Sequence, residues 1–277
     1  MEIVTLDITP PAADAPPRAA GVALITLNDP DKRNMLSEEM VDALVAILDR
    51  VEADQSVGAI VVTGAGRAFC AGANLGNLGR AGEAARGAQP AAERGTGMRS
   101  IYEAFLRFSR SPLPTVAAVN GAAVGAGMNL ALACDIRLAG RSARFDTRFL
   151  ELGLHPGGGH TWMLQRLVGL QTAAAMVLFG AVLDAAAAAE RGLVWSCVDD
   201  ADLLAESVAL AARAASGPRD LAVRIKATMG LVAGLDDHDA AVDAELEAQL
   251  WSLGQPFFAE RLAVVRQRVS GDASRSE

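Results

Sequence analysis

The chain is poor in aromatic residues and in cysteine, and each shortage limits what the protein can be. Only 4% of its 277 residues are aromatic while 51% are hydrophobic, so a large core must be built mainly from alanine, valine and leucine. The three cysteines, Cys70, Cys134 and Cys197, are odd in number, far apart and set among apolar residues. We therefore expect buried thiols in a reducing compartment rather than a disulfide framework.

Signals for export, membrane insertion and nucleic-acid binding are also missing. The N-terminal segment contains Glu2 and Asp7 and has no basic stretch before an apolar one, so no signal peptide is predicted. No apolar run approaches the length of a membrane span, so none is expected. The net charge of −8 argues against nucleic acid as the main partner. We expect a cytoplasmic protein.

Hydrophobic periodicity predicts an α/β protein with a helical C-terminal part. Apolar runs bounded by turn residues predict strands at 2–8, 22–27, 59–62, 115–119, 135–139 and 194–198. Ser37 is a candidate N-cap for a helix with its apolar face on Met40, Leu44, Ile47, Leu48 and Val51. The alternation of strands and helices implies parallel strands. Residues 76–97 have no apolar period and are expected to form a loop, with or without a short helix.

Two glycine- and alanine-rich turns are the strongest functional signal. The first reads GRAFCAGANL (66–75), and the second lies within PTVAAVNGAAVGAGMNLALACDIRLA (114–139). Each turn follows an apolar strand, so together they can bring two free backbone N–H groups to one point, where they would stabilise a carbonyl oxygen that becomes negative. The run GAAVGAG lacks both the spacing and the downstream acidic residue of a dinucleotide-binding fingerprint.

Several motifs in order resemble the crotonase (enoyl-CoA hydratase/isomerase) superfamily. Besides the two turns, these are NDPDKRNMLS (28–37), LGLHPGGGHTWMLQRLVG (152–169) and GAVLDAAAAAERGLVWSCV (180–198). The match covers roughly residues 20–235. It implies a crotonase-like spiral of β-β-α turns over 1–200, and a C-terminal helical region, 201–277, that mediates assembly into a homotrimer or a hexamer. It also implies an acyl-CoA thioester as the partner, with coenzyme A as part of the substrate and no bound cofactor or metal.

The resemblance also assigns roles to individual residues. The two N–H groups that hold the thioester oxygen would be those of Ala73 and Ala126. Lys32 and Arg33 stand where the family often places basic residues near the CoA phosphates and adenine, although a solvated pair before a helix is an equally good interpretation. Ala71, Asn74 and Leu75, around the first turn, would complete the substrate-binding and CoA-binding set.

The family's two catalytic carboxylates are missing from this chain. By resemblance, one glutamate would follow the second turn and the other would precede the L-G-x-x-P-G segment, but those positions hold Asn129 and Phe149. Neither side chain can exchange a proton near neutral pH. Because such groups contribute on the order of 10²–10⁴ each, ordinary hydratase turnover should be severely reduced.

Candidate replacements lie close by in the sequence. His155, in the turn before the glycines, and Glu151 are the best acid–base candidates. Asp146 is a further candidate, with a surface loop charge as the alternative interpretation, and His160 is expected to cap or pack at the start of a helix. No histidine spacing matches a zinc site.

Two functions from different classes remain open at this point. The first is an acyl-CoA enzyme, a hydratase-like lyase or isomerase, that stabilises a thioester enolate with atypical acid–base residues. The second is a non-catalytic acyl-CoA-binding protein on the same fold. A serine hydrolase is disfavoured, because no serine lies at either glycine turn and no G-x-S-x-G motif is present.

Overall fold

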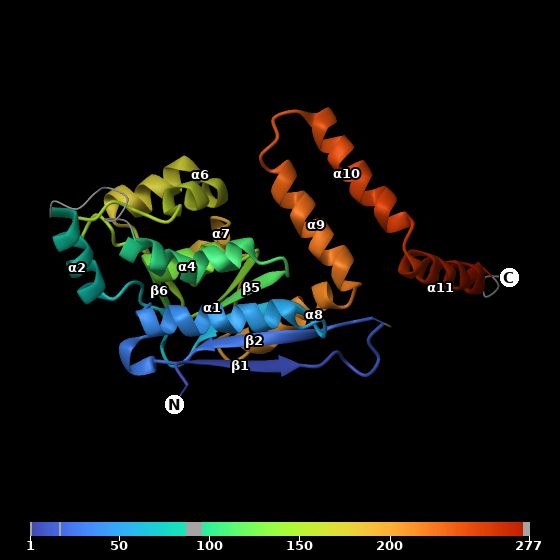
Figure 1. Cartoon of the computed structure of the whole chain (residues 1–277), viewed down its shortest axis with the longest axis horizontal. Coiled ribbons are helices and arrows are strands. Elements are labelled where there is room, and N and C mark those ends of the chain that lie inside the picture. Colours follow the sequence, from blue (N-terminus) through green and yellow to red (C-terminus); the bar gives the residue numbers. More distant parts are fainter. Residues whose placement is uncertain (1, 17, 87–95, 274–277) are drawn as a thin grey trace.

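Two β-sheets and the helices between their strands form the body of the protein (Figure 1). The computed structural model describes residues 2–16, 18–86 and 96–273. The first sheet has the order β1-β2-β3-β5-β7-β10, and the second has the order β4-β6-β8-β9. The strands are β1 (Val4–Thr9), β2 (Gly21–Leu27), β3 (Val57–Gly64), β4 (Ala68–Cys70), β5 (Thr115–Val119), β6 (Ala122–Val124), β7 (Ile136–Gly140), β8 (Arg144–Asp146), β9 (Leu183–Asp184) and β10 (Ser196–Val198).

Successive strand pairs divide between the two sheets, which confirms the predicted spiral. In β3–β4, β5–β6 and β7–β8 the first strand joins the six-stranded sheet and the second joins the four-stranded sheet. The neighbours β3, β5 and β7 pair in parallel, as do β4, β6 and β8. Helices carry the chain from one pair to the next, so the body consists of repeated β-β-α turns.

The helices fall into those that cover the sheets and those that leave the body. They are η1 (Pro30–Lys32), α1 (Glu38–Ala53), α2 (Leu75–Arg86), α4 (Thr96–Arg110), α5 (Ala126–Leu132), α6 (His160–Phe179), α7 (Ala185–Glu190), α8 (Leu203–Ala215), α9 (Arg219–Val232), α10 (His238–Leu253) and α11 (Pro256–Ala273). The α8 helix packs on β2, β3 and β5. The helices α9, α10 and α11 extend away from the sheets as an arm (Figure 1).

Local sequence rules account for α1 and the core beneath it. The Ser37 side chain accepts a hydrogen bond from the Met40 N–H at 3.2 Å, which confirms the predicted N-cap. The predicted apolar face of α1 is buried in the main core, where small residues and a few phenylalanines fill the space between helices and sheets.

Residues 75–86 form the helix α2 rather than a loop. The first part of the segment 76–97 is therefore a helix, as the prediction allowed, and 96–97 begin α4. Residues 87–95 lie outside the described part of the chain. The sequence of α2, LGNLGRAGEAAR, shows no apolar stripe because small residues occupy most positions. Its helical state is thus not visible as periodicity.

Among the described residues, the α6 helix is long and apolar enough, judged by length and composition only, to cross a membrane. This property is weak evidence for a span, and Gly169, at φ 73° and ψ 168°, interrupts the helical geometry within it. Each half is therefore shorter than a membrane-spanning segment. Trp162, Leu170 and Phe179 are exposed on this helix.

Candidate functional site

The two glycine turns lie against each other at the start of α5. Strands β4 and β6 pair in parallel, and each leads directly into one of the turns. A methyl group added to Gly127 would lie 2.1 Å from the Cys70 carbonyl oxygen, and one added to Gly72 would lie 2.6 Å from that of Val124. Both contacts are far too short for a side chain, so glycine is required at both positions for the two turns to meet.

Ala73 and Ala126 occupy neighbouring positions in this junction. Ala126 is the first residue of α5, and a methyl group on Gly72, which precedes Ala73, would lie 3.5 Å from the Ala126 nitrogen. In the described part of the chain, the N–H groups of Ala73 and Ala126 make no backbone hydrogen bond. For Ala126 this is expected, because the first N–H groups of a helix have no partner within the helix. Two backbone donors are thus available side by side.

The Gly125 conformation directs the chain into α5. Gly125 has φ 52° and ψ −114°, a left-handed geometry that favours glycine, and its N–H donates to the Asp146 carbonyl at 2.9 Å. This bond ties the second turn to β8. Asp146 is a buried strand residue, which rules out the alternative of a surface loop charge, and its carboxylate is paired with Arg148.

The segment that contains Lys32 and Arg33 runs beside the first turn. The Ala71 N–H donates to the Arg33 carbonyl at 3.0 Å, and the Leu36 N–H donates to the Gly72 carbonyl at 2.8 Å. The ammonium group of Lys32 lies 3.4 Å from the Asp29 carboxylate and is largely exposed. The two basic residues are therefore next to the glycine junction.

Asn34 is an organising residue that the sequence did not reveal. It is fully buried at φ 55°, and its amide nitrogen donates to the carbonyls of Ala65 and Ala68 at 2.9 and 2.8 Å. Its side-chain oxygen accepts from the Asp29 N–H at 2.9 Å. Asparagine tolerates left-handed backbone geometry, which is the one local signal that marks this position.

Asn129 and Phe149, which stand where the resemblance implies carboxylates, both contact one buried imidazole. His160, the first residue of α6, has its Nδ1 at 2.7 Å from the Asn129 side-chain oxygen. The Phe149 ring lies edge-on to the His160 ring, with centroids 4.9 Å apart. Asn129 also donates to the Gly157 carbonyl at 3.0 Å. The start of α5 therefore meets the segment 149–160, and His160 does pack, as predicted, on Asn129 and Phe149.

Burial controls the protonation of His160. The imidazole is fully buried, and desolvation lowers its pKa from 6.5 to about 4, because a charged ring is disfavoured away from water. Its Nε2 has no hydrogen-bond partner among the described residues. The ring is therefore neutral at physiological pH.

His155 and Glu151 occupy the surface of the same turn. The Nδ1 of His155 lies 2.7 Å from the Pro156 carbonyl oxygen, and the Glu151 carboxylate, which is 74% exposed, lies 3.7 Å from Arg148. Both residues are exposed, and the structure does not bring them into contact with Asn129 or Phe149. Their roles as acid or base stay predictions.

Two further residues of the predicted binding set begin α2. The Asn74 side-chain oxygen accepts from the Gly76 N–H at 2.7 Å, which fixes the entry to α2, and Leu75 is the first residue of that helix.

Cys70 and Cys134 are buried, which raises the pKa of each thiol to about 12, while Cys197 is half-buried. No group of histidine, cysteine and carboxylate side chains suited to a metal occurs among the described residues.

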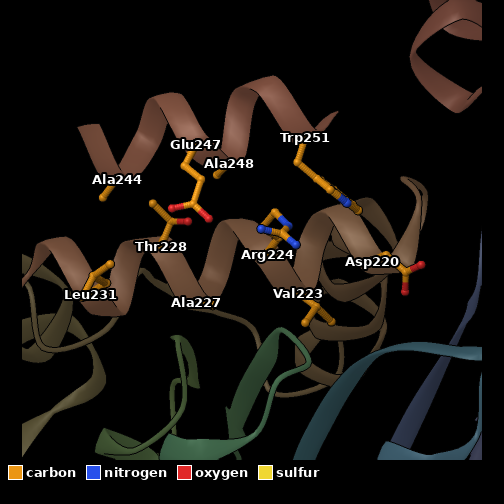
Figure 2. Close-up of a pocket in the computed structure, with 10 residues that line it drawn as sticks. All are labelled: Asp220, Val223, Arg224, Ala227, Thr228, Leu231, Ala244, Glu247, Ala248 and Trp251. Atoms are coloured by element: carbon orange, nitrogen blue, oxygen red, sulfur yellow. The ribbon is translucent and has the colours of Figure 1, made fainter. Parts of the chain in front are cut away.

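A separate groove lies between α9 and α10 in the arm (Figure 2). Arg224 lies over the Trp251 ring, 4.3 Å from its centroid, and Glu247 projects into the same space. None of the residues that line this groove belongs to the glycine turns. The groove is thus a feature of the arm and not of the junction.

Comparison with known proteins places the chain among acyl-CoA enzymes. Residues 17–253 match the Enoyl-CoA hydratase/isomerase family. The chain is 49% identical over 252 residues to a probable enoyl-CoA hydratase, EchA14, of Mycobacterium tuberculosis, covering 89% of this chain and 94% of that protein. It is 39% identical to the 1,2-epoxyphenylacetyl-CoA isomerase of Escherichia coli, covering 72% and 74%. A crystal structure of enoyl-CoA hydratase from Bacillus anthracis superposes with a TM-score of 0.83 at 26% identity, covering 96% of each chain.

Proposed function

The chain belongs to the enoyl-CoA hydratase/isomerase family, and we propose that it binds an acyl-CoA thioester with the carbonyl oxygen on the N–H groups of Ala73 and Ala126. The observation that supports this assignment is the junction itself. Glycines at 72 and 127 allow two turns to approach more closely than any side chain would permit, and two unpaired donors lie there. Such donors stabilise a thioester enolate, and each contributes about 2.7–4 kcal/mol to the transition state.

The CoA portion of the ligand would lie along the segment beside the first turn. The backbone of the segment that contains Lys32 and Arg33 is hydrogen-bonded to Ala71 and Gly72, so both basic residues lie close to the junction. Arginine and lysine pair well with phosphate groups. Asn74 and Leu75, at the entry to α2, border the same space.

We propose a hydratase-like lyase or isomerase reaction in which hydration of simple enoyl-CoAs is slow. Asn129 and Phe149, at the positions where the resemblance implies carboxylates, cannot transfer protons. One relative is named as a hydratase and another as an isomerase, so family membership is compatible with either reaction. Enolate stabilisation is the step common to both.

We also propose that the protein assembles into a homotrimer or a hexamer and acts in the cytoplasm. The arm exposes large apolar side chains, among them Met229 at 66%, Leu231 at 57% and Leu250 at 59%. Surfaces of this kind favour association. The thiols of Cys70, Cys134 and Cys197 are unpaired, as is typical of a reducing compartment.

Removal of one donor tests the proposed binding mode. In Ala126→Pro the ring replaces the N–H at the first helical position, where proline is tolerated. Turnover should fall by at least about 10²–10³-fold, because the proline Cδ takes the place of the N–H hydrogen. His238→Pro, at the exposed first residue of α10, is the matched control and should keep full turnover.

Two results would contradict the proposal. Failure of the unmodified protein to bind any CoA ester would remove the thioester as its ligand. Full turnover in Ala126→Pro would show that this N–H does not hold the oxygen. Binding without any turnover in a broad screen would instead support the non-catalytic alternative.

A further inference from the structure

We propose that His160 is the catalytic base of this site, positioned by Asn129, and that the reaction is a proton transfer between two carbons of the bound acyl group. This inference rests on the proposed acyl-CoA function. Its starting observation is that His160 contacts both residues that replace carboxylates, at 2.7 Å from Asn129 and with ring centroids 4.9 Å apart from Phe149. One titratable side chain is thus located between two that do not titrate.

The hydrogen-bond network fixes which ring nitrogen can accept a proton. The amide nitrogen of Asn129 donates to the Gly157 carbonyl, so the Asn129 oxygen faces His160 and accepts from it. His160 is therefore protonated at Nδ1, and Nε2 has a free lone pair. No described residue donates to this buried atom. A buried acceptor without a partner is costly in a folded protein, which favours a role toward a ligand.

Glycines hold Asn129 and His160 in this arrangement. A methyl group on Gly158 would lie 2.3 Å from the Phe105 ring and 3.3 Å from the Asn129 amide nitrogen, and one on Gly157 would lie 2.2 Å from the Tyr102 hydroxyl. The segment before α6 therefore passes tightly over α4 and α5, most restrictively at Gly158, whose φ of 66° also favours glycine. This close passage presents the Gly157 carbonyl to Asn129.

The imidazole lies one aromatic ring away from the proposed carbonyl site. The Phe149 ring contacts His160 on one side, and two of its carbons lie 3.9 and 4.0 Å from where a methyl group on Gly125 would be. Gly125 directly precedes Ala126, whose N–H would hold the thioester oxygen. An acyl chain that enters against Phe149 and displaces its ring edge would bring its α-carbon between that N–H and Nε2.

The charges around His160 leave it neutral and available as a base. Burial is the cause of its low pKa, about 4, with no charged neighbour contributing. On the adjoining turn Arg148 is paired with Asp146 and Glu151, and α5 contains no charged residue. A neutral imidazole can therefore accept a proton throughout the physiological range.

The reaction balances without any co-reactant. The C–H bond at the α- or γ-carbon breaks, its proton moves to Nε2, and its electron pair enters an enolate whose charge rests on the thioester oxygen. The imidazolium then returns the same proton to a different carbon, which shifts the double bond. A single base performs both steps, whereas hydration also requires activation of a water. A site with His160 as its single base thus favours isomerisation.

The decisive variant is His160→Asn. The asparagine amide can still donate to Asn129 in place of Nδ1, but nothing replaces Nε2. We expect α-proton exchange of butyryl-CoA in deuterated water and double-bond migration in a 3-enoyl-CoA to fall about 10²–10⁴-fold, with CoA-ester binding unchanged. His238→Asn, at the exposed first residue of α10, is the matched control and should stay within about twofold of the unmodified protein.

The pH profile of the unmodified protein supplies a second, independent readout. The exchange rate should be flat from about pH 8 to pH 5 and fall below that as His160 gains a proton. A rate that falls through about pH 6.5, the ordinary histidine value, would assign the proton to a solvated group and overturn the proposal. Exchange that survives His160→Asn, or CoA-ester binding with no exchange in the unmodified protein, would do the same, whereas loss of all CoA-ester binding would refute the proposed function itself.

Discussion

The buried imidazole of His160 should make the stability of the fold depend on pH. The unfolded chain binds a proton at this residue near pH 6.5, while the folded protein binds it only near pH 4, because burial lowers the pKa. Between these values the unfolded state holds more protons, so the free energy of unfolding falls as the pH falls. At about 1.4 kcal/mol per pH unit, the loss from pH 7 to pH 4 is about 3 kcal/mol.

Urea unfolding followed by circular dichroism measures this loss, at one fixed protein concentration and at pH 7, 5.5 and 4. Carboxylates also contribute to the pH dependence, but their share cancels when the unmodified protein is compared with His160→Asn. The variant should lose about 3 kcal/mol less over this range. Equal losses in the unmodified protein and His160→Asn would show that the His160 pKa is not lowered in the fold.

Three further substitutions probe the junction and its supports, each measured as the change in the free energy of unfolding in urea at pH 7. Gly127→Ala should cost about 3 kcal/mol or more, since its methyl group would lie 2.1 Å from the Cys70 carbonyl oxygen. The control Gly230→Ala, in open space on α9, should instead stabilise the protein by about 0.5–1 kcal/mol. Equal effects of the two substitutions would contradict the role of the close approach. Asn34→Ala should cost about 3 kcal/mol, because buried carbonyls lose their donor, and a loss below about 1 kcal/mol would show that water replaces it. Ser37→Ala should cost about 1 kcal/mol, and no change would mean that the N-cap bond is not formed in solution.

Long, periodic elements were predictable from the sequence, and short ones were not. The six predicted strands correspond to β1, β2, β3, β5, β7 and β10, and α1 follows from its N-cap and apolar stripe. The strands β4, β6, β8 and β9 have only two or three residues each, too few to show a period. Two of them, β4 and β6, nonetheless bring the glycine turns together, so tertiary pairing and not local pattern sets their place.

The site was predictable only where the backbone itself is the signal. Glycines at 72 and 127 identified the junction because no side chain fits there, whatever the surrounding residues. The contact between His160 and Asn129 spans 31 positions in the chain and has no local signature. An isolated histidine at a helix start looks like a packing residue, and its burial becomes visible only once α5, α6 and the turn at Phe149 are assembled.

The close contact of Gly127 with the Cys70 carbonyl has a consequence for how this protein can change. The spacing of the two turns depends on main-chain atoms alone, so exchanges at Asn129, Phe149 or His160 leave that spacing in place. If the thioester oxygen is held at this junction, substitutions can change the reaction without changing how the substrate is anchored. Point mutations at Asn129, Phe149 or His160 can alter the chemistry, whereas the glycines of the junction tolerate almost no substitution.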